Sequence, residues 1–267
     1  MTRIIKLILS AVYYIWFNTK RFVFKTLGIK QKPVCVALYY HSIFDNEKNN
    51  FNKQMELLSK KCKVIKSDYF GKLDNNNLYS IITFDDGFAN LVKNAVPILS
   101  EKKLPFTIFF ISDYFGKKPE WDFEGEHPDM NEKIMTVEQM NNLPEKLITI
   151  GSHSVSHNKL TSHLEEDLIF ELEESKKQLE KLSGKNVDVI AFPNGEYNNF
   201  IVQKSFAAGY KRVFTIEPKL ALQKDNEKIT GRVWVNGNDW FPEFWLKIHG
   251  AYSWLDKAFE IKKTLFN

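Results

Sequence analysis

The chain has 267 residues, of which 43% are hydrophobic and 26% are charged. This is the ordinary mix of a globular protein, and it excludes disorder or a fibrous repeat over most of the length. The length suits one large domain or two small ones. The two cysteines, Cys35 and Cys62, are too few for a disulfide framework or a cysteine-based zinc module.

The formal net charge of +4 is unevenly distributed along the chain. Residues 1–32 contain seven basic residues and no acidic one, which leaves 30 basic and 33 acidic residues for 33–267. A mildly acidic body lacks the basic surface that nucleic-acid binding requires. We therefore expect no nucleic-acid partner.

The N-terminal segment, residues 1–32, carries a short apolar run. The run covers residues 7–17, whereas a membrane-spanning helix needs about 20 apolar residues. No small-x-small pattern follows it, which argues against a cleaved signal peptide. A helical wheel places cations and polar groups on one face, namely Arg3, Lys6, Ser10, Tyr14, Asn18, Arg21 and Lys25. Apolar side chains lie away from that face, namely Ile5, Ile8, Val12, Ile15, Trp16, Phe22 and Val23.

This pattern is typical of an amphipathic helix that lies on an anionic membrane surface. Leu7 and Phe17 depart from it, because they fall in the polar arc. The expected location is therefore peripheral, on the cytoplasmic face of a membrane. A helix packed on the body is one alternative. A short signal-anchor, which would place the body outside the cytoplasm, is the other.

From residue 33 onward, expected strands alternate with expected helices. The expected strands are 34–40, 80–84, 106–111, 147–150, 187–192, 211–215 and 229–235. The expected helices are 51–62, 88–102, 136–142, 164–182, 198–208 and 242–264. This alternation predicts parallel βαβ units, in a barrel or an open sheet. No linker divides residues 33–267, so we expect one domain, with the polar insertion 121–129 as a lid or rim.

Polar side chains gather where the expected strands end. They are His41, Asp85, Asp86, His153, His157 and Asn194. The carboxyl ends of parallel strands open onto one face of a barrel, where active sites lie. We therefore expect these residues to meet in one site.

The adjacent carboxylates of Asp85 and Asp86 indicate a metal. Two ionised neighbours repel each other, and a bound cation relieves the conflict if one carboxylate ligates it while the other stays a base. His153 and His157 are four residues apart, and two histidines with one aspartate leave positions open for water, as in catalytic metal sites. An Fe(II) oxygenase uses the same ligand types. It does not need the second aspartate, and its strands are normally antiparallel.

Three motifs give the chain a family resemblance. Thr83–Gly87, with the sequence TFDDG, resembles the first motif of the polysaccharide deacetylases, the NodB-homology enzymes of carbohydrate esterase family 4. His153–His157 resembles their His-Ser/Thr-x-x-His motif, and Phe192–Gly195 is similar to the third motif. The resemblance implies a distorted (β/α)7 barrel, one divalent metal, usually zinc, and hydrolysis of an acetamide on a glycan.

Site roles follow from the resemblance position by position. It implies that Asp85 is the general base and that Asp86, His153 and His157 hold the metal. It also implies that the backbone N–H of Asn194 holds the oxyanion. The arginine that orients the base in the third motif is missing, because Ala191 occupies the nearest place. Arg232 is the candidate substitute, and it is grouped with Asn194 on the substrate side of the site.

The general acid is also missing from its usual place, a late Leu-x-His motif. Some relatives resemble a circular permutation, in which the strand that carries this motif moves to the N-terminus and ends in Tyr-His. Here Tyr40-His41 closes the first expected strand of the body. We therefore expect a circularly permuted member of the family, with His41 as the general acid.

The expected function is metal-dependent removal of N-acetyl groups from N-acetylhexosamine units. The expected substrate is a surface polysaccharide or its lipid-linked precursor. A related amidohydrolase that acts on a small non-sugar amide is one alternative. A non-catalytic glycan-binding relative is another, although a binding module has no need for the base Asp85.

Overall fold

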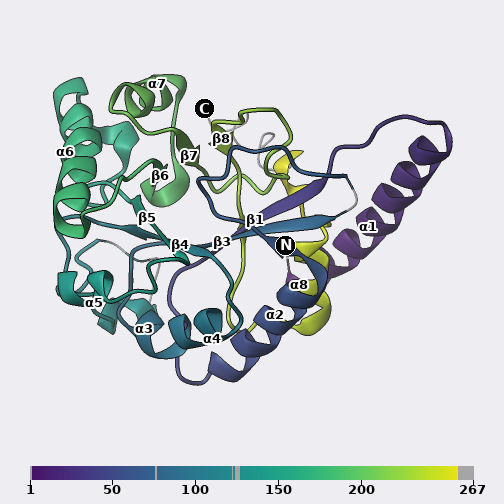
Figure 1. Cartoon of the computed structure of the whole chain (residues 1–267), viewed down its shortest axis with the longest axis horizontal. Helices are drawn as coiled ribbons and strands as arrows, with labels where there is room; N and C mark the ends of the chain where they lie inside the picture. Colours follow the sequence, from purple (N-terminus) through teal and green to yellow (C-terminus); the bar gives the residue numbers. More distant parts are fainter. Residues whose placement is uncertain (1, 76, 122, 124–126, 258–267) are drawn as a thin grey trace.

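A curled sheet of parallel strands forms the centre of the molecule, and helices pack around it (Figure 1). The computed structural model describes residues 2–75, 77–121, 123 and 127–257. The strands in this part of the chain are β1 (Val34–Tyr40), β2 (Lys63–Val64), β3 (Leu78–Phe84), β4 (Phe106–Phe110), β5 (Ile148–Ser152), β6 (Val189–Ala191), β7 (Arg212–Phe214), β8 (Ile229–Thr230) and β9 (Val233–Trp234). Their order is β8-β7-β6-β5-β4-β3-β1-β9, and β2 pairs with β3.

One bent segment joins the two edges of this sheet. Strand β8 pairs with β7, and β9 pairs with β1 at the opposite edge, yet only Gly231 and Arg232 separate β8 from β9. A Cβ atom on Gly231 would collide with the carbonyl oxygen of Glu217, so the bend depends on glycine. This arrangement confirms the expected α/β fold, a distorted barrel. The strand expected at 229–235 is present as two short pieces.

The helices are α1 (Arg3–Thr26), α2 (Lys48–Lys61), α3 (Asn90–Asn94), α4 (Val96–Glu101), α5 (Val137–Asn141), α6 (Glu165–Ser183), α7 (Asn199–Ala207) and α8 (Phe241–Ile248). Short 3-10 turns occur at Pro128–Asn131, Leu160–Ser162 and Pro193–Gly195. Helix α6 begins with three acidic residues, which suit the positive end of the helix dipole, and it ends at Gly184 with a φ of 66°. Such left-handed backbone favours glycine and is a common helix end.

Two expected helices differ from the structure. The helix expected at 88–102 is split into α3 and α4, and Pro97 occupies the first turn of α4, where its missing N–H costs nothing. The helix expected at 242–264 is interrupted after Ile248, because Gly250 turns the chain with a φ of 74° and Ala251 and Tyr252 enter the core. Residues 255–257 are helical again. Residues 258–264 lie outside the described part. Strand β2 was not expected from the sequence.

The core has two parts, one on each side of the sheet. Alternate residues of β1 divide between them: Val34, Val36 and Leu38 pack under the surrounding helices, whereas Cys35 and Ala37 face the interior of the barrel. This period of two is the side-chain geometry of a strand. Both cysteines are free and buried. The interior is filled, so the barrel positions a site only at its rim.

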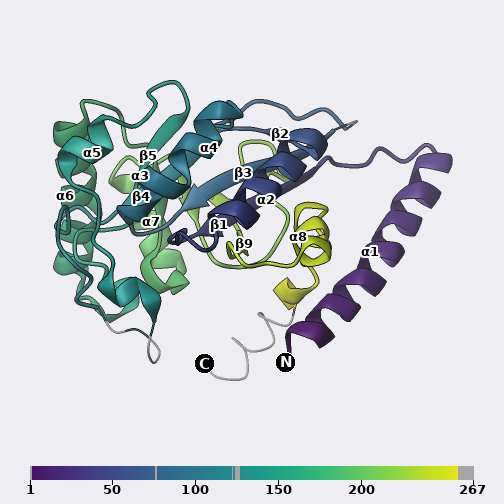
Figure 2. The ribbon, with the colours of Figure 1, turned by 90° about the horizontal axis from the view of Figure 1, so that it is seen from below.

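Helix α1 lies along one side of the body, as Figure 2 shows, and its N-terminal end is close to α8. The indole N–H of Trp254 donates to the buried Ser10 hydroxyl at 2.9 Å. The expected N-terminal helix is therefore present and docked on the body. Among the described residues, no helix combines the length and the apolar character that crossing a membrane requires.

Candidate active site

Asp86, His153 and His157 meet at the carboxyl ends of β3 and β5. Their candidate ligand atoms all lie within 4.8 Å of one another, and all three side chains are buried. The Nε2 atoms of His153 and His157 lie 3.4 Å and 3.3 Å from the same oxygen of Asp86, Oδ1. The spacing of the two motifs therefore produces one three-ligand cluster, as expected.

Neighbouring groups hold the imidazole of His153 and the backbone between the two histidines. The Nδ1 atom of His153 lies 2.8 Å from the carbonyl oxygen of Ala191, to which it can donate, and this directs Nε2 toward Asp86. Val155 and Ser156 lie between the two histidines in the sequence. Their backbone N–H groups donate to the carboxylate of Glu171 at 2.8 Å and 3.0 Å. Partners of this kind commonly orient metal ligands.

The chemistry of this cluster fits one divalent metal. Burial lowers the pKa of His153 to about 4, so its imidazole is neutral and has a lone pair to offer at neutral pH. Burial alone would raise the pKa of Asp86, but His157, His41 and His153 together hold it well below its usual range. Asp86 Oδ1 is buried and has no hydrogen-bond donor among the described residues. A buried anionic oxygen without a donor, facing two imidazole nitrogens, suits a cation such as zinc.

Asp85 forms a bidentate ion pair with Arg232, which comes from the bend between β8 and β9. The distances are 2.6 Å from Nη1 to Oδ1 and 2.9 Å from Nη2 to Oδ2. The guanidinium also donates to the hydroxyl of Thr83 and the carbonyl of Thr215, at 3.1 Å and 3.3 Å. Burial would raise the pKa of Asp85, but Arg232 is the main group that brings it below its usual value. Asp85 is thus held as an oriented anion.

This geometry accounts for the arginine that is missing at Ala191. The guanidinium arrives from a different strand and reaches the same carboxylate. Arg232 is fully buried, so its side chain presents no surface to a substrate. The contact with Asp85 agrees with the expectation that Arg232 replaces the arginine that orients the base. Its grouping with Asn194 on the substrate side stays a prediction.

His41 follows β1 and lies on the same rim. It lines a pocket of about 420 Å³ together with Asp129 and Trp234, and its charge would lower the pKa of both Asp85 and Asp86. By contrast, His249 packs on Trp245 and Tyr14 beneath α1. The position of His41 is compatible with the general-acid role, which stays a prediction, as does the circular permutation.

Asn194 lies in the 3-10 turn that follows β6. Its φ of 59° is left-handed, and its side chain is exposed. The turn begins two residues after Ala191, the residue that orients His153. The expected contact between its backbone N–H and an oxyanion stays a prediction.

Two buried carboxylates near the site were not expected from the sequence. Asp129, in the polar insertion, accepts from the Ser42 hydroxyl, and burial raises its pKa. It lies in the short 3-10 turn Pro128–Asn131, and its sequence surroundings resemble an ordinary turn. The burial of Glu171 could have been predicted from the sequence. It lies among the inward-facing leucines of α6, next to Leu172 and three residues after Leu168. A charge at such a position usually has a buried partner.

A barrel of parallel strands with a buried Asp-His-His cluster and a second, oriented carboxylate at its rim is the arrangement of a metal-dependent hydrolase. The family model described as polysaccharide deacetylase matches residues 73–213, just over half of the chain. The chain belongs to the polysaccharide deacetylase family.

Individual relatives are distant. The protein YxkH of Bacillus subtilis (strain 168) is 28% identical over 156 residues, which are 58% of this chain and 51% of that protein. The poly-beta-1,6-N-acetyl-D-glucosamine N-deacetylase of Staphylococcus aureus (strain MRSA252) is 27% identical over 169 residues, covering 62% of this chain and 57% of that enzyme. The chain thus spans little more than half the length of the curated relatives it matches.

The fold is also found among solved structures. IcaB from Ammonifex degensii superimposes with a TM-score of 0.67 at 20% identity, covering 84% of this chain and 98% of that chain. At this identity the likeness shows the fold alone.

Proposed function

We propose that this protein is a metal-dependent N-deacetylase that hydrolyses the acetamide of N-acetylhexosamine units in a glycan. The observation that carries the proposal is the pairing of Asp85 with Arg232 beside the Asp86, His153 and His157 cluster. A metal cluster alone would suit many functions. An adjacent carboxylate that is held ionised outside the ligand set is what a hydrolase needs as a base.

Each residue of the site has a separate role in the proposed hydrolysis. Asp86, His153 and His157 would hold one divalent metal, which we expect to be zinc, and this metal would supply Lewis-acid activation of the acetyl carbonyl and of water. Asp85 accepts the proton of the attacking water, and Arg232 keeps its carboxylate in place. The backbone N–H of Asn194 donates to the oxyanion. His41 protonates the leaving nitrogen, so that acetate and a free amine are released.

Two hollows beside the rim support a glycan as the substrate. The pocket next to His41 shares Trp234, Asn236 and Asn238 with a second pocket of about 520 Å³, which extends to Arg3 at the start of α1. Trp234 is 51% exposed between them. An exposed aromatic ring with amide groups around it offers the apolar face and the hydrogen bonds that a sugar ring uses.

The nature of the glycan is inferred from the relatives. The Staphylococcus aureus relative is by its name an N-deacetylase of poly-beta-1,6-N-acetyl-D-glucosamine. We extend this to an N-acetylhexosamine polymer, either a surface polysaccharide or its lipid-linked precursor. Two adjoining pockets suit a chain of sugars better than a small non-sugar amide.

Acetate release from defined N-acetylated oligosaccharides tests this function. The panel includes β-1,6-linked N-acetylglucosamine oligomers, their 1,4-linked counterparts and simple N-alkyl acetamides. We expect turnover of the sugars, loss of turnover with a chelator and recovery with zinc. Turnover of the simple amides alone would favour the small-amide alternative. Glycan binding without acetate release by the zinc-loaded protein would indicate a non-catalytic relative.

A further inference from the structure

The outward side of α1 is an almost continuous apolar surface. Its exposed side chains are Ile4, Ile5, Ile8, Leu9, Val12, Ile15, Trp16, Phe22 and Val23. At 1.5 Å per residue, the row from residue 4 to residue 23 is about 29 Å long. Ile15 and Phe22 are 66% and 68% exposed. Contiguous apolar surfaces of this size mark interaction sites.

Two polar side chains of α1, Arg3 and Ser10, contact the body on the opposite side of the helix. At 100° per residue, Arg3, Ser10 and Arg21 share one side of the helix, and the apolar row lies opposite them. Arg3 donates to Glu243 of α8 at 2.7 Å, and Ser10 is fully buried. A helix that only served to cover the body would bury its apolar side. Here the docked side is mixed, and the apolar side chains named above are exposed.

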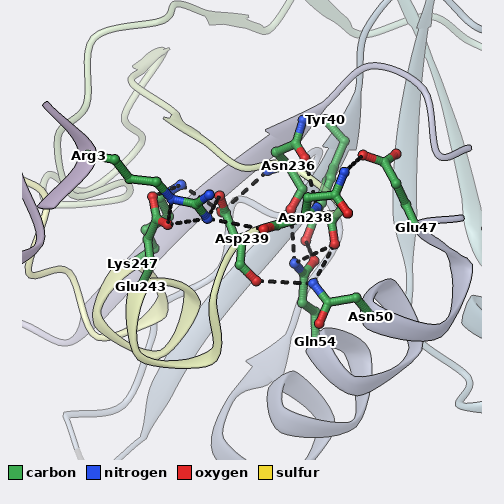
Figure 3. A network of polar contacts seen from close by, with 11 residues as sticks. Arg3, Tyr40, Glu47, Asn50, Gln54, Asn236, Asn238, Asp239, Glu243 and Lys247 are labelled. Carbon is green, nitrogen blue, oxygen red and sulfur yellow. Dashed lines mark hydrogen bonds and ion pairs between the residues drawn. The ribbon is translucent and has the colours of Figure 1, made fainter.

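A polar network holds α1 in this orientation (Figure 3). From Glu243 the contacts continue through Lys247 to Asp239, at 3.4 Å and 2.6 Å. Asn50 of α2 then donates to the carbonyl of Asp239 at 3.0 Å. The loop of residues 236–239 thus connects the start of α1 to α2.

The same network reaches the residue that precedes the proposed general acid. Gln54 donates to the carbonyl of Asn236 at 2.9 Å and accepts from the Tyr40 hydroxyl at 2.9 Å. Tyr40 directly precedes His41. Helix α1 is therefore fixed relative to the barrel rim.

We propose that the apolar side of α1, the nine side chains named above, inserts into the surface of an anionic lipid bilayer and holds the barrel rim at that surface. Trp16 and Phe22 are residues that favour the boundary between headgroups and acyl chains. Lys20 and Lys25 are exposed in the C-terminal half of the helix, Lys30 follows it, and residues 1–32 contain no acidic group. This charge complements anionic headgroups.

Charge also argues against a second copy of the chain as the occupant. If two copies paired through the apolar side of α1, their basic side chains would come together, and residues 1–32 contain no acidic residue to balance them. Repulsion between like charges disfavours such pairing. The structure changes the sequence expectation in one respect, because Arg3 pairs with Glu243 and Asp239 instead of facing headgroups. The side of the membrane stays a prediction.

Co-sedimentation of the full chain with vesicles tests the proposal. The vesicles are phosphatidylcholine alone, or phosphatidylcholine with phosphatidylglycerol. The test variant is Ile8→Gln/Val12→Gln/Ile15→Gln, which removes apolar surface without changing charge. The matched control is Leu164→Gln/Phe170→Gln/Phe200→Gln, which changes exposed apolar residues on and next to α6 and α7, at the end of the molecule away from α1 (Figure 1).

We expect the unmodified chain and the control to bind the anionic vesicles, and the test variant to bind at least about tenfold more weakly. Lys20→Gln/Lys25→Gln should weaken binding to anionic vesicles by about fivefold per lysine at low salt, with little effect on neutral ones. Acetate release from a soluble oligosaccharide requires no membrane, so it reports separately on folding and on the proposed function.

Two outcomes would overturn the proposal. In the first, the unmodified chain does not bind anionic vesicles, or the test variant binds them as well as the control does. In the second, light scattering shows a dimer that the test variant converts to a monomer, while neither form binds lipid. That result would assign the apolar side of α1 to pairing between copies of the chain.

Discussion

Arg232 and Asp85 are 147 residues apart in the sequence, yet each terminal nitrogen of the guanidinium donates to a different oxygen of the carboxylate. Both residues are buried, and the guanidinium lies 4.7 Å from the centre of the Tyr39 ring. The bend that closes the barrel is therefore also the element that orients the proposed base. Closure of the fold and preparation of the site depend on the same two residues, Gly231 and Arg232.

Replacing Arg232 with lysine separates charge from geometry. Lysine keeps the positive charge but lacks the planar fork that binds a carboxylate through two bonds. Arg232→Lys should keep its metal and lose turnover with little change in KM, since the residue does not reach substrate. Because Arg232 lowers the pKa of Asp85, a weaker contact raises that pKa, and the acidic limb of the kcat/KM profile should move to higher pH. An unchanged limb together with a raised KM would instead indicate substrate binding.

Asp85→Asn tests the base itself. An amide cannot accept the proton of water, so turnover should fall by about 10²–10⁴-fold, while elemental analysis should still find one metal per chain. The variant also leaves Arg232 buried without its counter-ion, which should lower the free energy of unfolding by about 3 kcal/mol. Asp85→Asn/Arg232→Met should recover part of that stability and none of the activity. Near-native turnover in Asp85→Asn would contradict the assignment.

Local sequence patterns were sufficient for the elements that carry the site. Strand β1 has the expected bounds 34–40, since a continuous apolar run ending in polar residues is typical of a buried parallel strand. The cluster of Asp86, His153 and His157 followed from motif spacing, because each motif is short and lies at the end of one strand. The family and the fold class are confirmed on the same basis.

Contacts between residues that are distant in the sequence could not be predicted from local sequence patterns. The division of 229–235 into two strands depends on its pairing with β7 at one edge of the sheet and with β1 at the other, and β1 lies far away in the sequence. A helical wheel of residues 3–26 predicted a polar side and an apolar side of α1. It did not show which of the two sides would face the body. That choice depends on partners such as Glu243 and Trp254, whose positions only the folded chain defines.

Variants of the proposed metal ligands, and of Glu171 beside them, test the cluster. Asp86→Ala and His157→Ala should each lose the metal, because a three-ligand site cannot replace a missing ligand. Glu171→Ala should weaken metal affinity by about 10–100-fold, as loss of a group that orients ligands commonly does. The matched control is Glu173→Ala, an exposed position on the same helix. Equal metal content in all four proteins by equilibrium dialysis would contradict the proposed ligands.

The last prediction concerns the proton that the leaving nitrogen must receive. Without it the tetrahedral intermediate expels water and returns to the amide, and a histidine at the rim is suited to supply it. His41 lines the pocket beside Trp234 and Asp129. His41→Ala should therefore keep its fold and its metal and lose turnover on N-acetylated sugars by about 10²-fold or more.

An activated acetate ester provides the discriminating measurement, because its leaving group departs without a proton. Turnover of such an ester by His41→Ala should remain close to that of the unmodified enzyme. His249→Ala is the matched control, since that imidazole packs against Trp245 away from the rim, and it should retain activity on both substrates. If His41→Ala loses activity equally on the amide and the ester, His41 positions the substrate or the site instead of donating the proton.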